Sequence, residues 1–261
     1  MKHVQSLLAL ALALAGAMGS AAAAPNWVGT ANYGVETIGP FSTYDLGTGT
    51  VLLESTGVAG SYNGYYQSFV TNHELFGTPV TSSLLNNSYE LTMVASFAET
   101  VTSVGSLSSI NVINGTFNIY LDTASTNHSY TGDSGFADGT AILTGTITGG
   151  TGAAVSSGAM VFGSTNIDIK VTGFDASVFN PATITDAGGI FTLRLNSPLD
   201  SSFLSGVSSV QGNAYNVGAG DLLFAADGQI ALAVPEAETY AMMLTGLGLV
   251  GFMVSRRRRS V

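Results

Sequence analysis

The stretch Ser109–Asp122, SINVINGTFNIYLD, carries the clearest local folding signal in the chain. Asn114-Gly115 lies between two runs in which apolar and polar residues alternate, and Asn-Gly favours the positive φ values of a type I′ turn. A two-residue loop at this point would place Val112 opposite Phe117 on the buried side of a hairpin. Because the turn chemistry and the apolar pattern agree on one register, the sequence predicts a β-hairpin centred on Asn114-Gly115.

Alternating runs elsewhere in the body predict further half-buried strands. Tyr89–Ala98 is the longest of them, with Tyr89 and every second residue after it on the buried face. Asn26–Gly64 is expected to be rich in loops. Lys170 and Arg194 are expected on solvent-facing sides of strands, each with a carboxylate partner across the strand pair. The other predicted strands are Val51–Glu54, Thr140–Thr148, Asn166–Thr172, Ile190–Leu195 and Gln229–Val234.

Glycine-rich breaks separate these segments, and neither a repeat nor a helical heptad is visible. The pattern therefore predicts an antiparallel all-β body, and the simplest architecture is a jelly-roll-like β-sandwich.

The composition indicates a body whose surface is solvated by hydroxyl and amide groups. Charged residues make up 9% of the chain and cysteine is absent. From Glu36 to Asp227 there are fifteen carboxylates against two basic residues, which gives a net charge of −13. Such a body would repel a phosphate backbone, so nucleic acid is excluded as a partner. Without disulfides, core packing must hold the fold.

The N-terminus reads as a Sec-type signal peptide over residues 1–23. A basic start, Met1-Lys2-His3, precedes an apolar run, Leu7–Ala17, and then the small residues Gly19–Ala24. The apolar run is shorter than a membrane span. We expect signal peptidase to cut after Ala22 or Ala23.

No catalytic constellation is visible in the body. His73 and His128 are far apart in the sequence, each in a polar stretch expected to be a loop, and neither belongs to a paired-ligand motif. A G-x-S-x-G elbow is missing as well. We therefore expect a protein that is not an enzyme and that requires no cofactor.

The loop Asp122–Gly139 is the densest polar stretch and offers Asp122, Asp133 and Asp138 as oxygen ligands for Ca²⁺. The alternative is ordinary turn chemistry, in which these side chains bind their own backbone. Aromatic residues offer a second candidate site. Tyr62, Tyr65, Tyr66 and Trp27 could stack on a sugar, and the alternative is that they are ordinary core aromatics.

The tail, residues 234–261, has three parts that together are typical of a sorting signal. The first is a short polar motif at Pro235–Glu236 and the second is an apolar run, Tyr240–Val254. Fifteen residues span roughly 22 Å as a helix at about 1.5 Å per residue, which makes a marginal transmembrane helix. The third part would stop transfer and keep the C-terminus cytoplasmic. It consists of four consecutive arginines, Arg256, Arg257, Arg258 and Arg259.

The tail resembles the PEP-CTERM sorting signal of Gram-negative bacteria. Ala237 stands where the family usually has proline. The resemblance implies transient anchoring in the inner membrane. An exosortase-type transpeptidase would then recognise the Pro-Glu motif, cut nearby and release residues 24–233 to the cell surface or the extracellular matrix. The matching residues are Val234, Pro235 and Glu236, then Glu238, Thr239 and Tyr240, the glycine-spaced run LTGLGLVGF, and the arginine cluster.

Within the body, Phe117–Thr123 and Asp133–Gly145 resemble the flocculation-associated PEP-CTERM proteins of the PepA type. This resemblance implies a structural role with exopolysaccharide in cell aggregation, flocculation or biofilm formation. The alternative is a carbohydrate-binding β-sandwich, with or without Ca²⁺.

Overall fold

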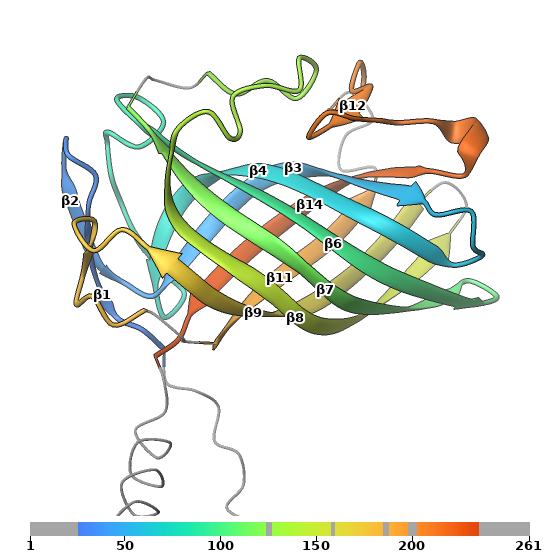
Figure 1. The fold of residues 1–261 in the computed structure, drawn as a ribbon, viewed down its shortest axis with the longest axis horizontal. Helices are drawn as coiled ribbons and strands as arrows, with labels where there is room; N and C mark the ends of the chain where they lie inside the picture. The colour runs from blue at the N-terminus through green and yellow to red at the C-terminus, as the bar shows by residue number, and fades with distance from the viewer. Residues whose placement is uncertain (1–25, 124–126, 158–159, 185–187, 198–202, 235–261) are drawn as a thin grey trace, which may run out of the picture.

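The long strands of the described residues wrap into a closed antiparallel sheet (Figure 1). The structure, a computed structural model, describes residues 26–123, 127–157, 160–184, 188–197 and 203–234. Pairing of β3, the first strand of the sheet order, with β4, the last strand of the ring, closes the barrel. A short strand, β5 (Thr78–Val80), pairs with the end of β4. Within the described part of the chain, eight strands form the ring in the order β3 (Thr43–Ser55), β14 (Leu222–Leu232), β11 (Gly188–Ser197), β9 (Met160–Phe174), β8 (Thr140–Ser157), β7 (Leu107–Asp122), β6 (Glu90–Val104) and β4 (Ser61–Leu75).

The prediction of an all-β, antiparallel body is confirmed, but the predicted jelly-roll-like sandwich is wrong. Two packed sheets and one closed sheet both require strands that alternate between a buried and an exposed face. What distinguishes them here is the pairing of β3 with both β14 and β4, which leaves no open edge in the ring. The prediction that Asn26–Gly64 is mainly loop is also wrong, because this segment contains β1, β2 and β3.

The hairpin predicted at Asn114-Gly115 is wrong as well, because β7 runs straight through it. Ala98 pairs with Asn114 and Glu99 with Val112, so Ile113 is the extra residue of a β-bulge. The actual turn between β6 and β7 lies at Gly105, whose φ is 62°. Gly115 has a different role, since a Cβ there would lie 2.2 Å from a backbone oxygen of β6.

A small three-stranded sheet covers one end of the barrel (Figure 1). Its strands are β10 (Phe179–Asn180), β1 (Gly29–Asn32) and β2 (Thr37–Phe41). Trp27 packs edge-on against Phe41 and Phe179, with ring centroids 5.4 and 5.9 Å away. These side chains belong to the same buried cluster as the barrel interior, so this end is closed by packed apolar groups.

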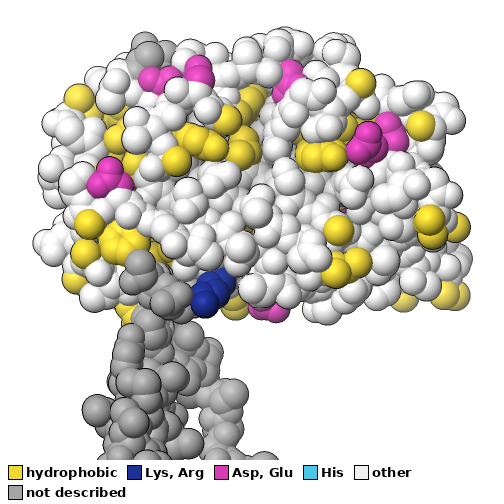
Figure 2. Space-filling view, viewed as in Figure 1, with side chains coloured by type: hydrophobic (Ala, Val, Ile, Leu, Met, Phe, Trp, Pro, Cys, Tyr) yellow, Lys and Arg dark blue, Asp and Glu magenta, His cyan; other side chains and the backbone are white. Residues whose placement is uncertain are grey.

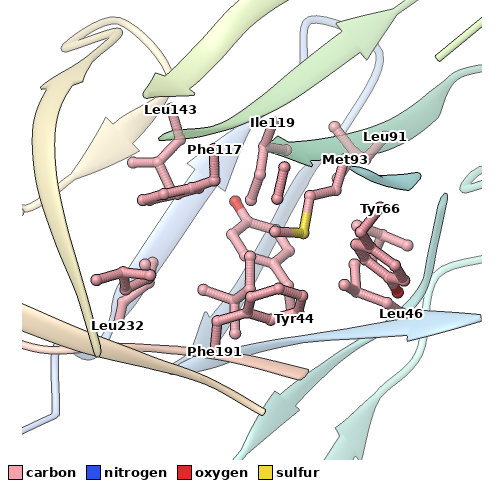
Figure 3. Close-up of a cluster of buried hydrophobic side chains, with 14 of the residues drawn as sticks. Tyr44, Leu46, Tyr66, Leu91, Met93, Phe117, Ile119, Leu143, Phe191 and Leu232 are labelled. Atoms are coloured by element: carbon pink, nitrogen blue, oxygen red, sulfur yellow. The ribbon is translucent and has the colours of Figure 1, made fainter. Parts of the chain in front are cut away.

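The barrel interior is filled by aromatic and aliphatic side chains, and Figure 3 shows part of this buried cluster. Tyr44, Tyr66, Phe117 and Phe191 come from four different strands and are all fully buried. The ring of Phe117 lies over Gly145 on the neighbouring strand, where a Cβ would be 2.2 Å from the ring. Glycine therefore makes the room that the large rings need.

The predicted inward faces are confirmed along several strands. Every second residue from Tyr89, directly before β6, to Phe97 is buried as predicted, and on β9 the same holds for Ile167, Ile169 and Val171. The prediction that Tyr89–Ala98 is only half-buried is wrong for its first part, because Glu90 and Thr92 of the opposite face are buried as well. Lys170 and Arg194 are exposed on the outer face, as predicted. Arg194 lies opposite Asp227 in the pairing of β11 with β14, so the carboxylate expected across from it is present.

The segment 203–221 folds back over the outside of the barrel (Figure 1). It contains β12 (Ser209–Val210), β13 (Asn213–Ala214) and the 3₁₀ turn η1 (Val217–Ala219). Val207 and Val210 pack on Leu52, an outward residue of β3, in a second buried cluster that is separate from the interior.

The visible surface carries few charged side chains (Figure 2). Within the described residues, no helix has the length and apolar character needed to cross a membrane.

The predicted targeting segments at both ends lie outside the described residues, apart from Val234. This is the case for the signal peptide, residues 1–23, and for the transmembrane helix, residues 240–254. Their predictions therefore stay predictions as far as the structure is concerned. The same applies to the sorting residues Pro235, Glu236, Glu238, Thr239 and Tyr240 and to the stop-transfer residues Arg256, Arg257, Arg258 and Arg259.

Candidate functional site

The barrel half farther from the small sheet contains a cavity of about 180 Å³. Its deepest lining residues, including Phe97, Ile167 and Leu193, are buried. Its outermost lining residues, Ser103, Ser156 and Leu222, are exposed at the strand ends. The cavity therefore opens to solvent at the barrel end opposite the small sheet.

The lining of the cavity is mainly aliphatic or small. Its aromatic members are Tyr62, Phe97 and Phe224. All eight strands of the ring contribute, which gives the cavity a continuous wall. The lining residues are Val51, Leu53, Tyr62, Phe97, Glu99, Val101, Ser103, Ser108, Ile110, Ala154, Ser156, Val161, Thr165, Ile167, Leu193, Leu195, Leu222 and Phe224.

Glu99 is the exception in this apolar wall. Its side chain is only 5% exposed, and it lies on β6 between Tyr62 of β4 and Val112 of β7. No hydrogen bond or ion pair from any described residue reaches its carboxyl group. Burial disfavours the charged form and raises the pKa of Glu99 to about 7. The cavity thus contains a carboxyl group that changes charge near neutral pH.

The electrostatics of the cavity are one-sided. Among its lining residues, all of which are described, only Glu99 and Tyr62 can ionise, and none is basic. A bound anion would therefore find no countercharge and would face a carboxylate above pH 7. The size of the cavity is also informative, since a dry cavity of about 150 Å³ in another protein binds benzene. Drug-sized ligands need roughly 300–1,000 Å³, so this cavity suits a small molecule or one end of a longer one.

The four predicted sugar-stacking aromatics do not share a surface. Trp27 and Tyr66 are fully buried in the core, so the prediction that they stack on a sugar is wrong and the alternative of ordinary core aromatics holds for these two. Trp27 donates its indole N–H to the Pro181 carbonyl. Tyr62 lines the cavity, while Tyr65 points outward, donates to a Glu54 oxygen at 3.3 Å and packs beneath segment 203–221.

The three predicted calcium ligands separate into two places. Asp122 and Asp138 both accept from the side-chain amide of Asn127, at 2.8 and 3.2 Å. Asp133 lies elsewhere and accepts from the amides of Gly212 and Gln211, at 2.7 and 2.9 Å. Within the described part of the chain, no group of three or more His, Cys, Asp or Glu residues could hold a metal ion.

Asp133 instead fastens segment 203–221 to the barrel. It also accepts from Gln67 of β4 at 3.1 Å. The Gln211 side chain donates in turn to the carbonyls of Tyr66 and Ala95, at 2.7 and 3.0 Å. Burial tends to raise the pKa of Asp133, but the hydrogen bonds from Gly212 and its other donors hold that pKa below its usual value.

The two histidines of the body occupy different environments, and the expectation that both lie in loops is wrong for His73. It is a buried residue of β4 whose Nε2 lies 2.8 Å from the Tyr33 hydroxyl. Burial lowers the pKa of His73 to about 4. His128 lies in a loop, with its Nδ1 2.7 Å from a Glu90 oxygen and its ring stacked on Phe69. Neither histidine lies beside a hydroxyl and an acid in a nucleophilic arrangement.

Sequence reasoning missed Glu99, although a signal for it exists. The predicted strand ended at Ala98, but the alternation that buries Tyr89 and Phe97 continues in phase to position 99. A carboxylate in phase with an inward apolar face is the signal that could have identified it.

The described residues thus define the class of the body as a closed antiparallel barrel with a small apolar cavity open at one end. Residues 233–259 match the family model of the PEP-CTERM protein-sorting motif. The chain thus carries a PEP-CTERM sorting motif, which implies a protein that is exported, processed by an exosortase and anchored transiently at the membrane before secretion. No curated protein and no solved structure matches the chain significantly.

Proposed function

We propose that the exported barrel binds a small, largely apolar molecule in its interior and holds it at the cell surface or in the extracellular matrix. The observation that carries this proposal is the cavity itself, which has walls from all eight strands of the ring and one open end. Filling these inward positions with larger side chains would be the simplest way to stabilise the fold. The space left open is therefore best explained by a ligand.

The walls favour binding by the hydrophobic effect. Most of the lining side chains are apolar, and a ligand with about 100 Å² of apolar surface would gain roughly 2.5 kcal/mol on burial. Binding requires no catalytic residue, which agrees with the sequence-based expectation that the protein is not an enzyme.

The test is to bind toluene to the exported protein and to a variant whose cavity is filled. Ala154 lines the cavity, whereas its neighbour Ala153 is exposed on the outer face of the same strand. Ala154→Phe should weaken toluene binding at least tenfold, as measured by calorimetry or by chemical-shift titration. Ala153→Phe is the matched control and should bind as the wild type does. Undetectable toluene binding to the wild-type protein, or equal binding to both variants, would refute the proposal.

A second role, as a structural matrix protein acting with exopolysaccharide in aggregation, flocculation or biofilm formation, is supported by the surface. Few charged side chains appear on the visible face (Figure 2). The sequence is rich in Ser, Thr and Asn, whose hydroxyl and amide groups suit contact with neutral polysaccharide. Deletion of the gene should then reduce flocculation, and full restoration by the Ala154→Phe variant would separate this role from ligand binding. Unchanged flocculation after deletion would argue against the matrix role.

A further inference from the structure

We infer that the cavity selects organic amines, with an apolar body of about the size of benzene in the barrel and a protonated amino group at Glu99. This inference rests on the proposed function, because it names the class of ligand for the same cavity. It adds a polar recognition element to a site otherwise defined only by shape.

The first argument is the isolation of the Glu99 carboxyl group. The side chain is more than nine-tenths buried and faces the cavity, and no described residue donates a hydrogen bond to it. Buried polar groups are normally hydrogen-bonded, because an unmet carboxylate costs several kcal/mol in an apolar environment. The protein supplies no donor, so a ligand that displaces solvent from the cavity must bring the matching donor itself.

The second argument is the sign of the charge. The described lining residues include no basic side chain, and the body as a whole carries fifteen carboxylates against two basic residues. Carboxylate and phosphate ligands are therefore repelled both locally and at long range. A cation gains on both counts, and its charge would be neutralised by Glu99 in a buried ion pair.

The third argument is position within the cavity. Glu99 lies between the deep residue Phe97 and the outer residue Val101 along β6, with Val51 and Leu193 contributing to the same wall. A ligand with an amino group at Glu99 would therefore have apolar surface around its body. Small aralkyl or alkyl amines have this combination, whereas strongly polar polyamines and amino acids do not.

Amine binding should depend on pH through Glu99. The groups that line the cavity around it are Tyr62 from β4 and otherwise uncharged side chains from the remaining strands. Below pH 7 the carboxyl group of the free protein is protonated, and an ammonium group can pair with it only after this proton is released to solvent. Affinity should then fall about tenfold for each pH unit below 7, and stay level above it until the amine itself loses its proton.

The experiment compares benzylamine, toluene and benzoate as probes of the exported protein at about pH 5.5 and about pH 8. These three share the same ring and differ in charge. At the higher pH, benzylamine should bind at least tenfold more tightly than toluene, and benzoate should not bind. At the lower pH the advantage of benzylamine should disappear, while toluene binding should stay constant.

Glu99→Gln should remove the benzylamine advantage and its pH dependence, and its circular-dichroism spectrum and urea unfolding show whether the variant is folded. Glu54→Gln is the matched control, since Glu54 lies on β3 and accepts from the outward Tyr65. This variant should retain the preference for benzylamine. Equal affinities of the wild-type protein for benzylamine and toluene at the higher pH would overturn the inference and leave the proposed function standing. Absence of binding by both probes would overturn both. If Glu99→Gln does not fold, a flat benzylamine affinity of the wild-type protein between the two pH values overturns the inference.

Discussion

Replacing Glu99 by glutamine should stabilise the ligand-free barrel at alkaline pH and have little effect in acid. Burial raises the pKa of this carboxyl group from 4.5 to about 7. Below pH 4.5 the carboxyl group is protonated in both the folded and the unfolded protein, so it does not affect the free energy of unfolding. As the pH rises from there through the folded-state pKa, the unfolded protein releases this proton more readily than the folded protein does, and the fold loses stability. At about 1.4 kcal/mol for each pKa unit, ionised Glu99 should cost the fold about 3 kcal/mol above pH 7. Glutamine has nearly the same shape and stays neutral.

The assay is urea unfolding of the exported wild-type protein and the Glu99→Gln variant at about pH 4 and about pH 8. The difference in unfolding free energy should be near zero at the lower pH and about 3 kcal/mol in favour of the variant at the higher pH, which corresponds to roughly 6–12 °C in Tm for a domain of this size. Glu54→Gln controls for the loss of one negative charge. An equal difference at both pH values would show that folding does not raise the pKa of Glu99. A wild type that is more stable than the variant at pH 8 would show that the carboxylate has a stabilising partner, and either result would refute the reasoning.

Three further predictions concern the packing, the outer segment and acid stability. Gly145→Val should destabilise the barrel by about 3 kcal/mol in urea unfolding, because the added Cβ would lie 2.2 Å from the Phe117 ring. Gly149→Val on the same strand is the control and should cost little, because only one atom lies within 4 Å of a Cβ there. Equal losses of stability in the two variants would contradict this account. Asp133→Ala should speed hydrogen exchange in residues 207–215 by at least tenfold, because it removes the carboxylate that accepts from two backbone amides and from the Gln67 side chain. Unchanged exchange would mean that apolar contacts alone hold the segment. His73→Gln should reduce the loss of stability between pH 6.5 and 4 by about 3 kcal/mol, because the buried imidazole has a pKa of about 4 and resists protonation in the fold. If the free energy of unfolding falls equally in the wild type and the variant over this pH range, the assignment is wrong.

Local pattern predicted the inward faces of the strands but not how far each strand runs. Ile167, Ile169 and Val171 are buried as expected, because a half-buried strand requires only that side chains alternate. The prediction of a turn at Asn114-Gly115 was wrong for a physical reason. An Asn-Gly pair favours a turn, but its glycine also permits the close backbone contact that Gly115 makes beside the β-bulge. The pairing of β6 with β7 across the bulge, which decides between these two uses, is a long-range property.

Closure of the barrel was beyond sequence reasoning for the same reason. Residues about 170 apart in the sequence pair when β3 meets β14, and no local signal specifies that contact. The cavity follows from closure, since side chains from eight strands must surround one space before its volume has a meaning. Glu99 was within reach as an inward-phase carboxylate, but its isolation from every described donor is visible only in three dimensions.

The positions of the chain ends relative to the cavity connect the sorting motif with the proposed binding role. Asn26 forms a bridge with Ala233, and the Trp27 amide donates to the Leu232 carbonyl at 2.9 Å, so both ends of the described body lie at the barrel end that the small sheet covers. The motif begins at residue 233, directly after β14. The cavity opens at the other end of the same strand, beside Leu222. A body attached through the motif would therefore keep its cavity mouth away from the point of attachment. Removal of residues before Asn26 and after Val234 would also leave every strand pairing of the ring intact, because β3 and β14 both lie within these limits.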